Sequence, residues 1–404
     1  MVLSYEEAAA LVRAQAGPLR ARARAVDRVG LAAAFDRVLA EPVAADRDQP
    51  PLPRSTRDGF ACRAADLQAG TLRVTGQLRA GEAWTHGELQ PGEALEIMTG
   101  AGVPPGADCV AMIEHVTVSE GTVRLLEARA VAAGDNIVPA GAEARRGDVV
   151  VPAGRRMGIT ETAAAAACGG ANLAVFLRPR VAILATGDEL VGIGETPQPH
   201  QIRNSNGPSL EALVRAAGGM PWTFPVVADE AAATERAIQT AAANCDLLLL
   251  TGGVSMGKHD YVEPALRAQG AEFFFTGVRM QPGKPVVFGK LAGPYFFGLP
   301  GNPISTMVTF AVFVAPLLRA LGGETEMEPR FVLARLEEDV RIAPGLTRFL
   351  PARMESDVDG ARVQRIGWHG SGDLAAAARA NSFLVVPETA ERLAAGDVVA
   401  VLLL

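Results

Sequence analysis

The sequence of 404 residues has almost no lysine, since Lys258, Lys284 and Lys290 are its only three and arginine supplies every other basic residue. All three lysines fall within one short window that is also rich in glycine. If a bias toward arginine had left these three lysines by chance, they would be scattered along the chain. Their clustering therefore favours a functional role for this window.

The sequence also lacks any basic run interleaved with aromatic residues, and its formal net charge is −7. Both features argue against a nucleic-acid partner. The densest basic stretch runs from Arg20 to Arg28, and we interpret it as a solvated face.

The four cysteines include no CxxC pair, and the five histidines are scattered. These spacings indicate neither a disulfide framework nor a structural zinc site, and they favour buried thiols in a reducing cytoplasm. Any metal is therefore expected to be a hard cation held by carboxylates.

No segment predicts a membrane span or an export signal. Ser4 and Glu7 form the pattern of a capping box that opens an amphipathic helix, without a cationic start. The uncharged stretch from Leu291 to Leu318 is interrupted by glycine and proline, which leaves an apolar helix of about fifteen residues, too short for a bilayer. We expect a buried core helix and a cytoplasmic protein.

The chain is long enough for several domains, and the pattern of apolar, glycine and proline residues changes along its length. Short strands with glycine turns predict a small β domain, alternating apolar runs and amphipathic helices predict a three-layer parallel α/β domain, and the C-terminal stretch predicts a small β-barrel or sandwich. The predicted division is a helical linker domain of residues 1–45 with 142–178, an inserted β domain of residues 46–141, an α/β domain of residues 179–326 and a C-terminal β domain of residues 327–404.

The α/β pattern places polar residues at the carboxyl ends of its strands, where ligands of parallel sheets bind. The predicted rim comprises Asp188, Glu189, Asp229, Gly252, Gly253 and Asp260. Carboxylates that face loops rich in main-chain donors suit a magnesium and phosphoester site. For any single acid, capping of a helix is the structural alternative.

Two further motifs follow the third of these strands. Lys284 in QPGKP has stiff proline neighbours, which suits a pre-positioned cation aimed at phosphate. Asn302 in GLPGNP directly precedes an apolar helix, where it can cap the helix and also border an anion site. Neither GxGxxG nor GxxxxGK[ST] occurs, which argues against a standard dinucleotide site or a Walker loop.

Taken in order, the motifs resemble the molybdopterin molybdenumtransferase family, which includes MoeA and the gephyrin E domain. The resemblance rests on seven segments: PxxRSTRDGFA (Pro51 to Ala61), GEALEIMTGAGVPPGADCV (Gly92 to Val110), ATGDEL, NSN, TGGVSMGKHD, QPGKP and GLPGNP. It covers essentially the whole chain.

The resemblance implies an enzyme that inserts molybdate into adenylylated molybdopterin with Mg²⁺ and releases AMP and the molybdenum cofactor. It also implies a homodimer, with the site in a cleft between the α/β domain of one subunit and the small β domain of its partner. The catalytic residues that it implies are Asp58, Thr99, Glu189, Asp229, Asp260 and Lys284, with Glu189 and Asp260 as metal ligands. The substrate-binding residues that we predict are Ser205, Asn206, Gly252, Gly253, Ser255, Gly283, Pro300, Gly301 and Asn302.

The chain departs from the family where several cations are expected. Gln281 and Gly277 stand where the family often has lysine, and Ile137 to Gly141 replaces a stretch that often carries arginine. Arg279 or Arg145 are candidates to compensate. Two alternatives therefore remain open: a catalytically weak molybdopterin-binding or scaffold protein, and an enzyme acting on another nucleotide.

Overall fold

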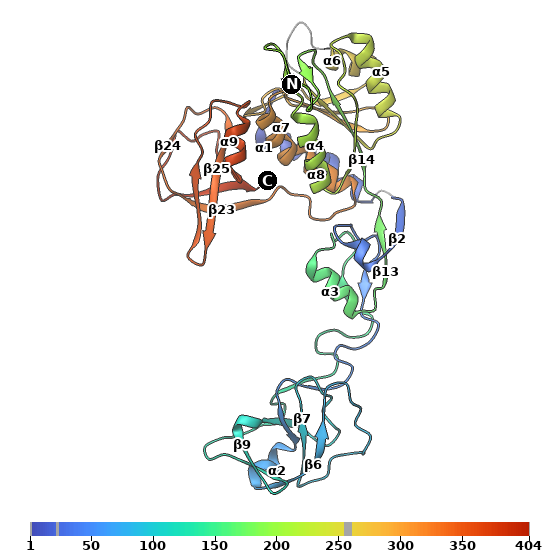
Figure 1. The fold of residues 1–404 in the computed structure, drawn as a ribbon, viewed down its shortest axis with the longest axis vertical. Helices are drawn as coiled ribbons and strands as arrows, with labels where there is room; N and C mark the ends of the chain where they lie inside the picture. Colours follow the sequence, from blue (N-terminus) through green and yellow to red (C-terminus); the bar gives the residue numbers. More distant parts are fainter. Residues whose placement is uncertain (1, 22–23, 254–260, 404) are drawn as a thin grey trace.

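The structure, a computed structural model, describes residues 2–21, 24–253 and 261–403. The molecule is elongated, with an α/β unit and a barrel side by side at one end and a small β unit at the other (Figure 1). A narrow linking unit joins the two ends. The small β unit therefore stands far from the strand tips of its own chain.

The α/β unit is built on a six-stranded sheet with the order β17-β14-β18-β22-β21-β19, whose first four strands are parallel. Its strands are β14 (Arg180–Ala185), β17 (Met220–Thr223), β18 (Leu247–Thr251), β19 (Glu272–Phe275), β21 (Val287–Lys290) and β22 (Tyr295–Leu299). The sheet confirms the predicted parallel core, although β21 runs antiparallel to β22 and β19 antiparallel to β21.

Helices cover both faces of this sheet, as the continuous apolar strands predict. Leu247 and Leu249 pack in one core and Leu248 and Leu250 in the other, because successive side chains of a strand point to opposite faces. The first core includes residues of α1 (Tyr5–Ala16), α4 (Asn206–Ala216), α7 (Pro303–Thr309) and α8 (Ala315–Leu321); the second includes residues of α5 (Ala231–Ala242) and α6 (Val262–Ala268).

The apolar helix after β22 runs from Pro303 to Leu321, with a π-helical segment at Phe310–Val314. Its 19 residues exceed the predicted length of about fifteen, and by length and composition alone the helix is long and apolar enough to cross a membrane. However, 78% of its most apolar window is buried inside the protein. It is the core helix that the sequence predicted.

The N-terminal helix α1 packs with the α/β unit. Ser4 Oγ accepts from the Glu7 amide at 3.1 Å and Glu7 Oε2 accepts from the Ser4 amide at 2.7 Å, which confirms the capping box. The preceding strand β1 (Val2–Ser4) pairs with β20 (Gly277–Gln281), and Ala8 and Val12 enter the α/β core. This packing differs from the predicted grouping of residues 1–45 with residues 142–178.

The linking unit contains the antiparallel pair β2 (Val26–Gly30) and β13 (Asn172–Phe176) with helix α3 (Ile159–Ala167). Its own small core includes Leu39, Met157 and Val175. The pairs β3 (Val43–Ala44) with β12 (Val149–Val151), and β4 (Arg54–Ser55) with β11 (Ile137–Val138), lead toward the small β unit.

The small β unit is a six-stranded sheet with the order β8-β5-β7-β6-β10-β9 and one short helix, α2 (Ala64–Ala69). Its strands are β5 (Gly59–Cys62), β6 (Leu72–Leu78), β7 (Glu93–Ile97), β8 (Cys109–Met112), β9 (Val116–Ser119) and β10 (Thr122–Leu125). Cys62 and Cys109 are fully buried opposite each other on β5 and β8, with their sulfurs 3.6 Å apart as free thiols.

The C-terminal unit is a closed barrel, because β25 pairs with both β26 and β27 in the ring β25-β26-β23-β29-β27. The main strands are β23 (Phe331–Leu336), β25 (Thr347–Asp357), β26 (Gly360–Arg365), β27 (Ser382–Val386) and β29 (Val398–Leu403). The smaller elements are β24 (Val340–Arg341), β28 (Arg392–Leu393) and helix α9 (Leu374–Arg379). Strand β20 also pairs with β25, so the barrel is continuous with the α/β unit (Figure 1).

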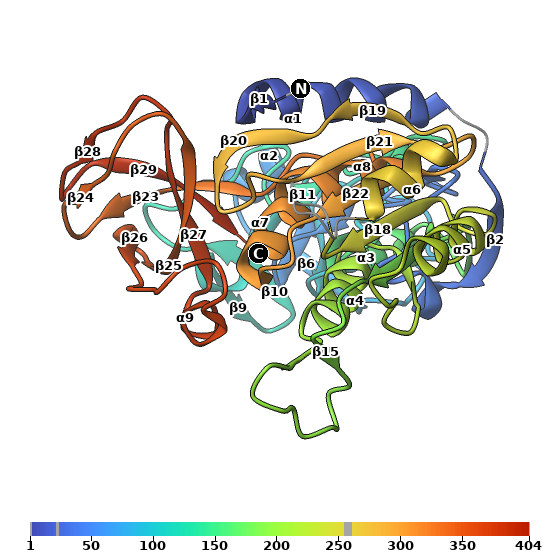
Figure 2. The ribbon, with the colours of Figure 1, turned by 90° about the horizontal axis from the view of Figure 1, so that it is seen from above.

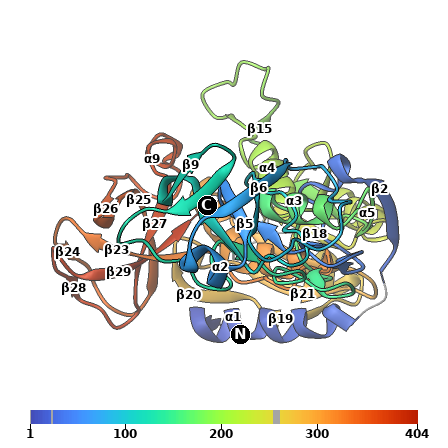
Figure 3. The same ribbon diagram turned by 90° about the horizontal axis from the view of Figure 1, so that it is seen from below.

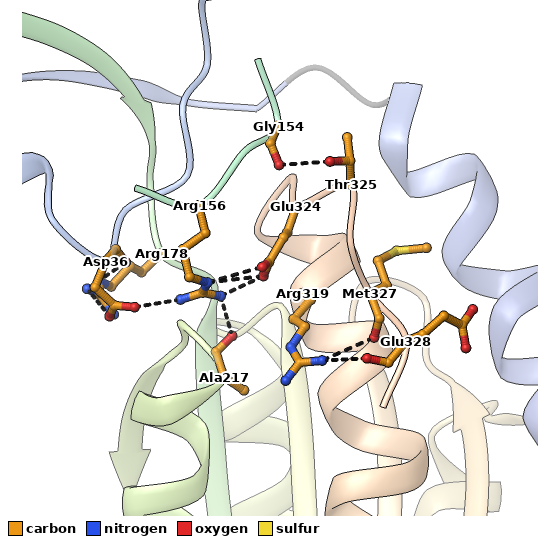
Figure 4. A network of polar contacts seen from close by, with 10 residues as sticks. All are labelled: Asp36, Gly154, Arg156, Arg178, Ala217, Arg319, Glu324, Thr325, Met327 and Glu328. Carbon is orange, nitrogen blue, oxygen red and sulfur yellow. Dashed lines mark hydrogen bonds and ion pairs between the residues drawn. The ribbon is translucent and has the colours of Figure 1, made fainter. Parts of the chain in front are cut away.

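An ion-pair network fastens the linking unit to the α/β unit (Figure 4). Arg156 lies 2.7 Å from Glu324 and 3.0 Å from Asp36, and Asp36 also pairs with Arg178 at 3.0 Å. Arg156 additionally donates to the Ala217 carbonyl at 3.1 Å. Burial acts to lower the pKa of Arg156, but the hydrogen bonds and charge of Glu324 outweigh it and the pKa is raised. Arg156 therefore stays charged and holds the two units together.

Candidate active site

A cavity of about 690 Å³ opens at the carboxyl ends of β14, β18 and β22. Eight of the predicted site residues line it: Glu189, Ser205, Asn206, Gly252, Gly253, Pro300, Gly301 and Asn302. The structure thus places these sequence-distant motifs around one hollow.

The turn after β18 needs glycine. Gly252 and Gly253 have φ angles of 85° and 60°, in the left-handed region that other residues resist. A Cβ on Gly252 would lie 2.5 Å from the carbonyl oxygen of Thr186, so no side chain fits there. The backbone of this turn can therefore approach a ligand closely.

Asn206 ties three of the cavity loops together from the buried start of α4. Its Nδ2 donates to Thr251 Oγ1 at 2.9 Å and to the Gly301 carbonyl at 2.7 Å. The neighbouring Ser205 is half-buried and lines the cavity. These contacts assign Asn206 a clear role in shaping the cavity.

Asn302 occupies the N-cap position of α7, but its side chain makes no capping hydrogen bond. Instead, its Nδ2 donates to Ser371 Oγ at 2.9 Å, and the Ile304 amide donates to the Ser371 carbonyl at 3.0 Å. The predicted side-chain cap is therefore wrong, because the barrel supplies the partner for both groups.

The predicted acidic rim is only partly assembled around the cavity. Glu189 is exposed and lines it. Asp188 and Asp229 instead bind each other's main chain: the Asp188 amide donates to Asp229 Oδ2 at 3.3 Å and the Asp229 amide donates to Asp188 Oδ1 at 3.1 Å. Asp229 thus fixes the loop beside the cavity and is not among its lining residues.

The QPGKP turn borders the cavity through Pro285. Gly283 has a φ of 113°, and a Cβ there would lie 2.5 Å from Thr309 Cγ2, so glycine is required. Lys284 is exposed next to Pro285, although it is not itself part of the described lining.

Two residues at or near the positions where the family often has lysine are engaged with the C-terminal barrel. Gln281 Oε1 accepts from Arg348 Nε at 2.9 Å, and Arg279 forms an ion pair with Glu388 at 3.0 Å. Arg279 does not line the cavity, so its suggested role as a replacement cation is not supported.

Asp58 and Thr99 lie together on the exposed surface of the small β unit, far from the cavity of the same chain (Figure 1). Asp58 Oδ1 accepts from the Thr99 amide at 2.6 Å and from Thr99 Oγ1 at 2.8 Å. The amide and hydroxyl of Thr99 lower the pKa of Asp58. Asp58 is therefore held as an oriented carboxylate.

Ser255 and Asp260 lie outside the described residues, as does Lys258. Within the part of the chain that the structure describes, no cluster of three or more His, Cys, Asp or Glu side chains could hold a metal ion. Glu189 is thus the one acidic side chain in the described lining of the cavity.

Four lining residues lie outside the motifs that the sequence analysis singled out: Ile202, Arg203, Gly372 and Leu374. Arg203 sits beside the NSN motif, and Gly372 and Leu374 come from the barrel. The glycine-rich turn GWHGSGDL (Gly367 to Leu374) was the available signal for the barrel's contribution.

Family models match three consecutive regions of this chain. They are the MoeA N-terminal region (domains I and II) over residues 3–169, a probable molybdopterin binding domain over residues 182–320, and the MoeA C-terminal region (domain IV) over residues 333–404. The molecule is therefore a multi-domain protein built around an α/β domain of the molybdopterin-binding class.

Whole-chain relatives give the family itself. The molybdopterin molybdenumtransferase of Staphylococcus aureus (strain COL) is 33% identical over 381 residues, covering 93% of this chain and 90% of that protein. The Nostoc sp. protein of the same name is 36% identical over 371 residues, covering 89% and 84%. The crystal structure of the Pyrococcus horikoshii OT3 molybdopterin biosynthesis moeA protein superposes with a TM-score of 0.82 at 28% identity, covering both chains completely. The chain belongs to the MoeA family of molybdopterin molybdenumtransferases, which confirms the resemblance seen in the motifs.

Proposed function

We propose that this protein inserts molybdate into adenylylated molybdopterin and releases AMP and the molybdenum cofactor. The observation that carries the proposal is the cavity at the strand tips, where glycine turns and helix starts offer main-chain donors beside Glu189. Such donors suit a pyrophosphate group, since its negative charge is stabilised by amides at close range.

The chemistry that we infer is hydrolysis of the phosphoanhydride coupled to metal insertion. A water oxygen bonds to one phosphorus while the bridging P–O bond breaks, and the water proton is released. AMP and the pterin phosphate are the products, and molybdate is a substrate that enters beside them. Like charges meet in this site, so cations must offset their repulsion.

Mg²⁺ fits the donor set, because this ion is commonly held by one or two carboxylates together with substrate phosphates. Glu189 is exposed at the cavity and has no ion pair among the described residues. Asp260 remains the predicted second ligand. When bound, the ion would neutralise charge on the phosphates.

The remote position of Asp58 supports a site shared by two subunits. Asp58 is an exposed carboxylate held by Thr99 in the small β unit, which stands far from the strand-tip cavity of its own chain. We propose that the small β unit of one subunit reaches the α/β cavity of the other, so that Asp58, Thr99, Lys284 and the acidic rim meet. Cytoplasmic location stays a prediction.

The direct test supplies purified protein with adenylylated molybdopterin, Mg²⁺ and molybdate, and measures AMP by chromatography. Molybdate-dependent release of AMP with formation of the molybdenum cofactor is expected. A folded protein that binds the pterin and releases no AMP would instead be a binding or scaffold protein. If the protein released a nucleoside monophosphate from an unrelated nucleotide with a higher kcat/KM than from adenylylated molybdopterin, that nucleotide would be its substrate.

A further inference from the structure

Arg203 is the one basic residue in the described lining of the cavity. The other described lining residues are neutral except for Glu189. Main-chain donors alone would face an anionic ligand with partial charges, whereas a guanidinium adds a full charge and planar paired donors.

The chain holds Arg203 at the cavity through a two-stranded ribbon. Strand β15 (Leu190–Val191) pairs with β16 (Ile202–Arg203), and the Ile202 and Asn204 amides donate to the Glu189 and Val191 carbonyls at 2.8 and 3.0 Å. The loop between the two strands projects away from the α/β unit (Figures 2 and 3). Its two ends, with Glu189 on one and Arg203 on the other, therefore stand together at the cavity.

The guanidinium of Arg203 is anchored at one nitrogen only. Nε donates to the Glu195 carbonyl at 2.9 Å, and among the described residues neither terminal nitrogen has a hydrogen bond or an ion pair. Among the described residues Glu189 and Arg203 form no ion pair with each other; Glu189 precedes the start of β15, whereas Arg203 is at the end of the parallel strand β16. Both charges therefore remain available to a ligand.

We propose that Arg203 binds a tetrahedral oxyanion in this cavity, either a phosphate of the substrate or molybdate. The inference rests on the proposed function and deepens it, since it assigns a cation to a site that lacks lysine at Gln281 and Gly277. A phosphate oxygen and a molybdate oxygen present the same chemistry to a guanidinium, so the two sources are separated by experiment.

The test measures binding of inorganic molybdate and of inorganic pyrophosphate separately by calorimetry, without turnover. Arg203→Gln should weaken binding of at least one probe by about ten- to hundredfold, the range of a charge-assisted hydrogen bond. Arg203→Lys should retain part of the affinity. Arg215→Gln is the matched control and should change neither affinity, because Arg215 is on the exposed face of α4 and, among the described residues, forms its ion pair with Glu211.

A loss confined to molybdate, or to pyrophosphate, identifies the oxyanion and supports the proposal. Affinities of Arg203→Gln within about twofold of the wild type for both probes would overturn it. It would also be overturned if both Arg203 variants lost binding together with faster hydrogen exchange of the Ile202 and Asn204 amides, because Arg203 would then only clamp the loop. If Arg203-dependent binding persists but no AMP is released in turnover, the proposed function fails and the role of Arg203 stands.

Discussion

Thr99 tunes a single carboxylate, Asp58, on the surface of the small β unit. Its amide and hydroxyl lower the pKa of Asp58, so Asp58 stays ionised as the pH falls. Thr99→Val removes the hydroxyl donor and leaves the amide, which should raise the pKa of Asp58 toward its ordinary value. If the reaction needs this carboxylate, the acid limb of the profile of kcat/KM against pH moves to higher pH.

Thr122→Val is the control for this experiment. Thr122 lies in the same β unit, and its hydroxyl donates to the Ser119 carbonyl in a turn. Its profile should match the wild type. An unchanged acid limb in Thr99→Val would show that Asp58 is not the group that titrates.

Gly252 is the second position where a single residue determines the shape of the cavity. Gly252→Ala places a Cβ 2.5 Å from the Thr186 carbonyl oxygen at a φ of 85°, so the turn must move. We expect a loss of about 1–3 kcal/mol in the free energy of unfolding and weaker binding of pyrophosphate. Gly293→Ala is the control, because its Cβ would meet nothing within 4 Å. Equal denaturation midpoints for the two variants would contradict the claim that position 252 requires glycine.

At the scale of elements, the alternation of strand and helix predicted the α/β unit well. β14, α4, α5 and β18 follow the expected order, since their apolar periods are clear. The predicted strand at Trp222 was less accurate: β17 ends at Thr223, and only a bridge at Val227 continues it. Pro225 lies between them, where it removes a main-chain donor.

The parts of the site that local sequence could not show depend on tertiary contacts. Ser371 takes the Asn302 side chain across from the barrel, and no periodic pattern links residues so distant in the chain. Asp229 looked like a rim acid, but its carboxylate is engaged with the main chain of Asp188. Capping and ligand binding use the same residue types, so only the fold separates them.

The ion-pair network between the linking unit and the α/β unit sets the direction of the arm, by which we mean the linking unit together with the small β unit. Arg156→Met would leave Glu324, whose side chain is 11% exposed, without its main partner. We expect a loss of about 3 kcal/mol in the free energy of unfolding, measured with urea, because an unpaired buried charge remains. Small-angle scattering should also show a wider range of arm positions.

The double variant Arg156→Met with Glu324→Leu is the matched control for this ion-pair network. Removing both charges should recover most of the stability, since no buried charge is left alone. A double variant as unstable as the single one would mean that the ion pair is not what Arg156→Met disrupts.

At the scale of the whole molecule, the fold explains why two motif sets are separated. The cavity motifs converge in the α/β unit, whereas Asp58 and Thr99 converge in the small β unit, which stands apart from it (Figure 1). The strand pattern and the glycine motifs predicted the cavity set, whereas only the family resemblance implied Asp58 and Thr99. Their separation in one chain leads to the central claim that a complete site needs two chains.

Mixing two inactive variants tests that claim most directly. Asp58→Asn and Glu189→Gln are each expected to be inactive as homodimers. Unfolded together and refolded in equal amounts, they should form about half heterodimers, each with one intact site, and so recover about a quarter of the wild-type rate of AMP release. Recovery of no activity from folded heterodimers would contradict a site shared between subunits.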